Sequence, residues 1–223
     1  MRWIKEQSLS LFFLALFLAT LFAHSFAGQR AYNAEQLAHD SEPLSWSRYI
    51  VSSNFGEAVI ENWQSEWLQF MVFTMATIWL IQKGSNESKN PDEAGTESDQ
   101  KQRVGAFADN RSPRWARATG LPRKIYENSF LIVMTAIFLD SWLVQSLTGL
   151  NEFNDEQRQH DEATVAWTTY LVRADFWEKT LQNWQSEFLA VGTMAVFTIY
   201  LRQRGSPESK PVGAPHDETG ASA

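Results

Sequence analysis

Four apolar blocks separated by polar stretches dominate the pattern of the chain. The first covers residues 8–28 and the third residues 129–150, and each has about the 20 residues that a helix needs to cross a bilayer core. The second and fourth blocks are shorter, but they reach that length when extended backwards through a Trp-Gln-Ser-Glu segment, to about 63–82 and 184–203. The pattern therefore predicts four transmembrane helices.

The two halves of the chain resemble each other. Residues 2–89 align with residues 123–210 at an offset of 121 without a gap, and 34 of the 88 aligned pairs are identical. The densest matches are two motifs that occur once in each half: Asn-Trp-Gln-Ser-Glu at 62–66 and 183–187, and Gly-Ser-x-Glu-Ser-Lys at 84–89 and 205–210. Chance does not produce such agreement, so the sequence indicates an internal duplication.

We therefore expect an all-α fold, a transmembrane four-helix bundle from a tandem duplication of a two-span unit. Repeat one covers residues 1–89 and repeat two residues 122–210. Residues 90–121 are polar and basic with few large apolar groups, which predicts a disordered linker. The small, polar tail of residues 211–223 is also expected to be disordered.

The first apolar block also fits a secretory signal peptide. Arg2 and Lys5 precede it, and Ser25-Phe26-Ala27 resembles a cleavage site. The counterpart of this block, residues 129–149, lies in the middle of the chain, where a removable signal has no use. The repeat therefore favours a retained span.

The distribution of Lys and Arg predicts the orientation. Of the 19 basic residues, 14 lie in the N-terminal flank, the linker and the tail, whereas segments 29–62 and 151–183 hold five basic and 12 acidic residues. Because basic residues concentrate on the cytoplasmic side, we expect both termini and the linker inside and the two acidic loops outside.

Composition and motifs argue against several classes of protein. The balance of 19 Lys and Arg against 26 Asp and Glu gives no support to a nucleic-acid partner. The absence of cysteine excludes disulfides, thiolate zinc sites and a cysteine nucleophile. The sequence has no phosphate loop, nucleophile elbow, metalloprotease helix or dinucleotide fingerprint. These observations weigh against an ordinary enzyme, and we expect no cofactor.

Two carboxylates fall within the second and fourth predicted spans. Glu66 and Glu187 each lie one turn after an asparagine, Asn62 and Asn183, so that amide and carboxylate share a helix face. An ionisable group inside a span is costly unless it is paired or hydrated, which makes this set a candidate polar membrane site. The alternative is that these glutamates lie at headgroup depth and pair locally.

Asp140 lies about midway along the third predicted span. Its counterpart is Ala19, in a stripe of alanines four residues apart that lets helices approach closely. One interpretation of Asp140 is a proton or cation relay. The other is a single hydrogen-bonding residue that fixes helix packing.

Each acidic loop contains a histidine four residues after a glutamate. Glu35 with His39, and Glu156 with His160, would share a helix face and are candidate metal ligands. Two ligands per repeat fall short of the three or four in a complete site, so both repeats would have to combine. We expect no metal.

The Asn-Trp-Gln-Ser-Glu segment, followed by a short span and Gln-x-Gly-Ser-x-Glu-Ser-Lys, resembles a family of small bacterial membrane proteins of unknown function. The resemblance covers residues 2–210. It implies a bacterial multi-pass protein. For such a protein we expect the bacterial inner (cell) membrane. It supplies no activity, ligand or catalytic residue.

The sequence favours a non-enzymatic membrane protein that works as an interaction or scaffold component. Its partners would be the lipid bilayer and either a second copy of the chain or another membrane protein. The alternative is a small channel or transporter that uses Glu66, Glu187 and Asp140 along a polar path. The third hypothesis is a membrane enzyme built on Glu and His residues of the outer face.

Overall fold

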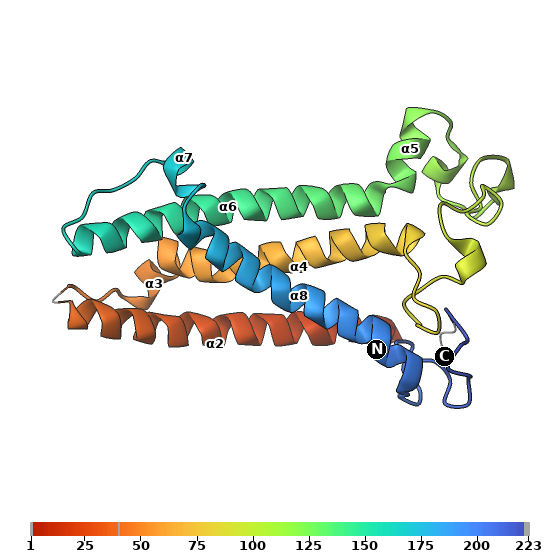
Figure 1. Cartoon of the computed structure of the whole chain (residues 1–223), viewed down its shortest axis with the longest axis horizontal. Helices are drawn as coiled ribbons and strands as arrows, with labels where there is room; N and C mark the ends of the chain where they lie inside the picture. The colour runs from red at the N-terminus through yellow and green to blue at the C-terminus, as the bar shows by residue number, and fades with distance from the viewer. Residues whose placement is uncertain (1, 40, 221–223) are drawn as a thin grey trace. The chain divides into compact units, whose positions relative to one another are not determined.

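The computed structural model describes residues 2–39 and 41–220, and within these residues it contains helices and no β-strand (Figure 1). The all-α class is thus confirmed for the described residues. The α-helices are α1 (Arg2–Glu6), α2 (Ser8–Ala38), α3 (Trp46–Tyr49), α4 (Ser53–Trp79), α5 (Leu121–Glu127), α6 (Ser129–Gln159), α7 (Trp167–Tyr170) and α8 (Ala174–Tyr200).

The two longest helices are also the most apolar. α2 and α6 have 31 residues each, or about 46 Å at the α-helical rise, which exceeds the ~30 Å of a bilayer core. Neither contains a proline. Leu, Phe and Ala dominate the first two thirds of α2, and the same part of α6 is also mostly apolar, with Ile, Val, Met and Trp besides Leu and Phe. Among the described residues, only these two helices are long and apolar enough to cross a membrane. They contain the predicted spans 8–28 and 129–150.

The order of helices in the first half of the chain recurs in the second. The sequence α2, α3, α4 has lengths of 31, 4 and 27 residues, and α6, α7, α8 has the same lengths. Each helix of the second set begins 121 residues after its counterpart in the first set; α2 begins at Ser8 and α6 at Ser129, for example. We call two residues that lie 121 positions apart corresponding positions.

The chain divides into two compact units, each described by itself. The first unit consists of Met1–Ile60 with Leu143–Phe176, and the second of Glu61–Trp142 with Trp177–Ala223. The first therefore holds α2, most of both acidic loops and the C-terminal part of α6. The second holds most of α4 and α8, the N-terminal part of α6, the linker and the tail.

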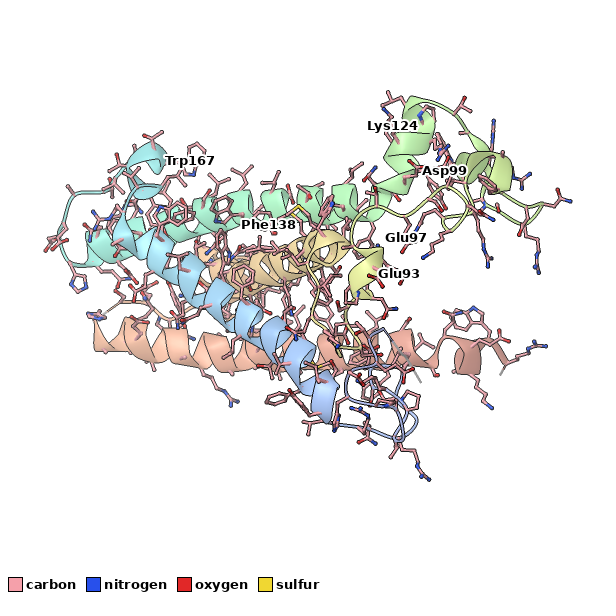
Figure 2. All side chains as sticks on the ribbon, turned by 45° about the vertical axis from the view of Figure 1, so that its right-hand side comes forward. Glu93, Glu97, Asp99, Lys124, Phe138 and Trp167 are labelled. Atoms are coloured by element: carbon pink, nitrogen blue, oxygen red, sulfur yellow. The ribbon has the colours of Figure 1, made fainter. Side chains whose placement is uncertain are left out.

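The linker in the second unit is a succession of turns with three short 3-10 helices, η1 (Pro91–Glu93), η2 (Gly105–Phe107) and η3 (Arg114–Arg117). Its acidic side chains, several of them labelled in Figure 2, form exposed ion pairs, with Lys101 to Glu93 at 2.5 Å and Arg123 to Asp99 at 2.6 Å. Exposed pairs stabilise a fold little. The expected disorder of this segment in solution stays a prediction.

Candidate functional site

An asparagine closes the turn after each long helix of the first unit. Asn33 Oδ1 accepts the backbone N–H of Leu44 at 2.8 Å, and its amide donates to the Leu44 carbonyl at 2.9 Å. Asn154 bonds Val165 in the same way, at 2.8 and 3.0 Å. Each asparagine thus supplies the partners that an extended loop residue needs, and it fixes where the loop turns back.

A tryptophan then anchors each short helix to the long helix before it. The indole N–H of Trp46 in α3 donates to Ser25 Oγ at 3.0 Å, and that of Trp167 in α7, labelled in Figure 2, donates to Ser146 Oγ at 3.0 Å. Sequence reasoning missed these anchors and the asparagines because it concentrated on ionisable groups. The available signal was that the Asn, Ser and Trp positions are identical in both halves.

A buried tyrosine packs on a glycine in both halves. A Cβ atom added to Gly28 would lie 2.3 Å from Tyr49 Oη, and one added to Gly149 would lie 2.5 Å from Tyr170 Oη. Both tyrosines are almost fully buried. Only glycine permits this approach, so the pairs define how closely α3 and α7 lie on their long helices.

The candidate metal ligands lie on exposed positions of the first unit. The rings of His39 and His160 are brought together, with centroids 5.6 Å apart in an edge-to-face arrangement. Glu35 and Glu156 line a small cavity of about 40 Å³ nearby in the same unit. Among the described residues, no three His, Asp or Glu side chains are grouped so that they would hold a metal ion.

The two Asn-Trp-Gln-Ser-Glu motifs contact each other in the second unit. The indole N–H of Trp184 donates to Gln64 Oε1 at 2.9 Å, and Ser65 Oγ donates to Glu187 Oε1 at 3.4 Å. One turn earlier, the amide of Asn183 donates to Glu61 Oε1 at 3.4 Å. We call this set of hydrogen bonds between α4 and α8 the motif contact.

Aromatic rings of α6 surround the tryptophan of the motif contact. The Trp184 ring lies 5.7 Å from that of Trp142 and 6.2 Å from that of Phe138, which is labelled in Figure 2. Phe138 and Trp142 stack on each other at 5.6 Å. Offset and edge-to-face ring pairs of this kind stabilise a packed cluster beyond the area they bury. The cluster holds the Trp184 indole in position to reach Gln64.

The side chains of the predicted membrane site differ in their exposure. Asn183 and Glu187 are half-buried in the motif contact, whereas Asn62 and Glu66 are exposed. Asp140 is exposed on α6 and takes no part in the contact. The candidate residues thus differ in exposure within the second unit, and their role as one polar membrane site stays a prediction. Sequence reasoning missed Gln64 and Ser65, which are neutral but fully buried there.

The second motif forms the same turn after α4 and after α8. Ser88 Oγ accepts the backbone N–H of Gln82 at 3.0 Å, and Ser209 Oγ accepts that of Gln203 at 2.9 Å. The glycine of each turn, such as Gly84 with φ of 84°, has the left-handed conformation that follows many helix ends. The motif is thus a helix stop of the same form in both halves.

The lysine that ends this motif secures the segment that follows. Lys210 Nζ is buried and donates to the carbonyls of Pro215, His216 and Glu218, each at 3.0 Å. Burial lowers the pKa of the Lys210 ammonium, and the charge of Arg202 lowers it further. Its counterpart makes a similar closure, with Lys89 Nζ 3.1 Å from the Gly95 carbonyl.

The two turns also meet in the second unit. Ser85 Oγ lies 3.1 Å from Thr198 Oγ1 of α8, and the Asn86 amide is 3.4 Å from the Pro207 carbonyl. Burial raises the pKa of the Glu87 carboxyl above its ordinary value, and the nearby charge of Glu208 raises it further. The turns therefore extend the packing of α4 on α8 beyond the motif contact.

Over residues 2–39 and 41–220, these features define a helical protein with two helices long and apolar enough to span a membrane, closed at their ends by turns that recur 121 residues apart. The chain belongs to a family described as a domain of unknown function (DUF6766), which matches residues 1–221. Comparisons with curated proteins and with solved structures gave no match. Membership of an uncharacterised family is thus confirmed.

Proposed function

We propose that this chain is a multi-pass protein of a bacterial inner membrane that acts as a non-enzymatic interaction or scaffold component. One observation carries the membrane assignment. The apolar side chains of α2 face outward, with Phe12 62% and Phe13 58% exposed. A helix of this composition would be covered in a soluble core, and so large an exposed apolar surface is stable only against lipid or another protein.

The number of spans in this proposal is four, from the tandem duplication of a two-span unit. α4 and α8 have 27 residues each, about 40 Å, which is long enough to cross a bilayer core. Both run into the same helix-stop turn, whose flanks are rich in Lys and Arg. With the basic flanks inside, both termini and the linker are cytoplasmic and the acidic loops face outward.

The hydrogen bonds that the motif side chains form between α4 and α8 support a scaffold role. Gln64 and Ser65 are fully buried and form their hydrogen bonds in the packing of α4 against α8, and Trp184 is held by rings of α6. A polar group that is hydrogen-bonded across two helices strengthens helix association in lipid. These residues therefore form a rigid contact and present little polar surface to a substrate.

A second function, a small channel or transporter, is favoured by one detail of the same contact. Gln64 Nε2 is buried and has no hydrogen-bond partner among the residues that the structure describes. Buried polar atoms of this kind recruit water, and a file of waters beside Glu187 would be the beginning of a polar path.

Labelling of introduced cysteines separates the two functions, because the chain contains no cysteine of its own. Single cysteines at Glu187 and Asp140 would be treated in membranes with a small, water-soluble maleimide. Glu162→Cys in an acidic loop is the positive control, and Leu14→Cys on the apolar face of α2 the negative control. The scaffold proposal predicts labelling at neither test position. Labelling at both positions to the level of the Glu162→Cys control would overturn it in favour of a water-filled path.

A further inference from the structure

The segment that leads into α6 is basic and contains no acidic residue. From residue 110 to residue 126 it holds Arg111, Arg114, Arg117, Arg123 and Lys124. Arg111, Arg114 and Lys124 are exposed, and none of the three forms an ion pair with an acidic side chain that the structure describes. Their charges are therefore available to an anionic partner.

The helix α5 in this segment has two unlike faces. At about 100° per residue, Arg123 and Glu127 lie on one side of the helix, and Leu121 and Ile125 lie on the opposite side. Arg123 pairs with Glu127 and, at 2.6 Å, with Asp99 of the linker. On the other side, Leu121 is 69% and Ile125 51% exposed. One face is thus held by the linker, and the apolar face is turned outward.

The short helix η3 packs against α5 within the second unit and adds an aromatic side chain. Its Trp115 is 53% exposed, whereas the neighbouring Ala116 is buried. Arg117 stabilises the turn by donating to the carbonyls of Asn110 and Ser112 at 2.9 and 2.8 Å. An exposed tryptophan beside basic residues is typical of the headgroup region of a membrane.

The junction of α5 with α6 determines where these side chains lie relative to a membrane. α5 ends at Glu127 and α6 begins at Ser129, so one residue separates them. Figures 1 and 2 both show α5 turning sharply away from the axis of α6 at this point. α6 is long and apolar enough to cross a bilayer. A helix that turns away from the beginning of such a span runs along the membrane surface.

We propose that η3 and α5 form an interfacial element that docks on the anionic phospholipids of the leaflet where α6 begins. We call Trp115, Leu121 and Ile125, together with Arg114 and Lys124, the docking surface. The three apolar side chains enter the headgroup region, and the two basic side chains bind lipid phosphates. The proposal rests on the proposed function, because α6 must cross the membrane.

Two observations favour lipid over the alternatives. A basic flank that only sets the orientation of a span needs charge alone, and it has no use for three exposed apolar side chains. An acidic protein would also match the charge. However, the single residue between α5 and α6 keeps the docking surface at the depth of the headgroups, where lipid is the partner already present.

Lipid quenching of a fluorescent label tests the proposal on the full chain, which has no cysteine of its own. The variant Ile125→Cys would carry an environment-sensitive fluorophore. Val133→Cys in α6 is the positive control, and Gln100→Cys at an exposed position of the linker is the negative control. Each would be reconstituted into phosphatidylcholine vesicles with or without about a third of phosphatidylglycerol, containing a lipid with a nitroxide high on its acyl chain. Both leaflets have the same composition, so the orientation of the protein does not matter.

In the anionic vesicles, the label at position 125 should be quenched almost as strongly as the label at position 133, and the label at position 100 should be quenched little. Without phosphatidylglycerol, quenching at position 125 should fall severalfold. Quenching at 133 without quenching at 125 would reject the docking and leave the span intact. Absence of quenching at 133 would instead overturn the membrane assignment of α6. Equal quenching at 125 in both vesicle types would overturn the assignment to anionic lipid.

A charge variant provides the second readout. Each basic residue near an anionic surface contributes about fivefold to binding, so Arg114→Gln with Lys124→Gln should lower the ratio of docked to undocked label at position 125 by about 25-fold. Lys101→Gln with Arg103→Gln is the matched control, because it removes two charges from exposed linker positions outside the docking surface. Equal losses from the two double variants would show that quenching follows net charge alone, which contradicts the proposal.

Discussion

Trp184 donates its indole N–H to Gln64 Oε1 at 2.9 Å, which joins the two copies of one motif through different residues of each. Gln64 is fully buried, whereas its counterpart Gln185 is exposed. The same residue type thus lies in a buried environment in one half and in an exposed environment in the other. The structure therefore predicts that the same substitution changes stability by different amounts in the two halves.

The first prediction compares Gln64→Ala with Gln185→Ala. Loss of Gln64 leaves the indole N–H of Trp184 buried without its partner, which costs about 1–3 kcal/mol of unfolding free energy. Gln185→Ala removes an exposed side chain and should change the stability of the detergent-solubilised monomer by less than about 0.5 kcal/mol. Denaturant unfolding followed by tryptophan fluorescence measures both. Equal losses would contradict the asymmetric contact.

The second prediction concerns the glycines beneath the buried tyrosines. Gly28→Ala and Gly149→Ala each place a Cβ within 2.5 Å of a tyrosine hydroxyl, and overpacking of this kind costs about 1–3 kcal/mol. Gly192→Ala is the control, because a Cβ there meets nothing within 4 Å, and alanine should stabilise that helix by up to about 1 kcal/mol.

A rescue variant sharpens the glycine test. Tyr49→Phe removes the hydroxyl that a Cβ at Gly28 would strike, so the double variant Gly28→Ala, Tyr49→Phe should recover part of the lost stability. Thermal unfolding in one detergent measures all four members of the cycle. Strict additivity of the two substitutions would show that the close approach of Tyr49 to Gly28 is not what destabilises the alanine variant.

The third prediction is a pH dependence at Glu87. The folded pKa of this carboxyl is raised by burial and by Glu208, so the folded state holds the proton more tightly than the unfolded state. The stability from the protonated group is present below the unfolded pKa and is lost as pH rises through the folded pKa.

Glu87→Gln should therefore stabilise the protein at pH 7, by on the order of 0.5 kcal/mol because the group is partly exposed. The gain should vanish near pH 4, where the wild-type carboxyl is protonated. Melting temperatures measured from pH 4 to pH 8 give the comparison. A gain that does not change with pH would mean that charge at Glu87 is not its source.

The fourth prediction concerns the tail. Lys210→Met removes three hydrogen bonds from an ammonium to backbone carbonyls, and bonds to a charged donor contribute about 1.5–3 kcal/mol. The segment around residues 215–218 should then be cleaved by a non-specific protease at least about tenfold faster. Lys83→Met, at an exposed position, is the control. Unchanged cleavage would show that the lysine does not hold the tail.

The helical class and the two longest helices could be predicted from the sequence, because an apolar run of about 20 residues is a local signal. The turns that follow α2 and α6 were not predicted. Asn33 and Trp46 are single polar or amphipathic residues whose partners, Leu44 and Ser25, are set by how the loop turns back. Their identity in the two halves was visible, but identity alone does not name a contact.

The difference in burial between the two motifs could not be predicted from the sequence. Leu68 and Leu189 occupy corresponding positions two residues after the same five-residue motif, so local propensity and periodicity assign them the same environment. Their exposures differ because one half packs on the other through unlike faces, and this choice is made by tertiary packing.

The measurement that tests the account most directly is labelling of intact cells with a membrane-impermeant maleimide, using the single variants Gln100→Cys in the linker and Glu162→Cys in the second acidic loop. Four spans with the basic flanks inside place position 162 outside and position 100 inside. Only the Glu162→Cys variant should therefore react until the cells are permeabilised. If only α2 and α6 cross the membrane, the linker lies outside and the second loop inside. Labelling of the Gln100→Cys variant with protection of the Glu162→Cys variant would therefore contradict the four-span protein proposed here.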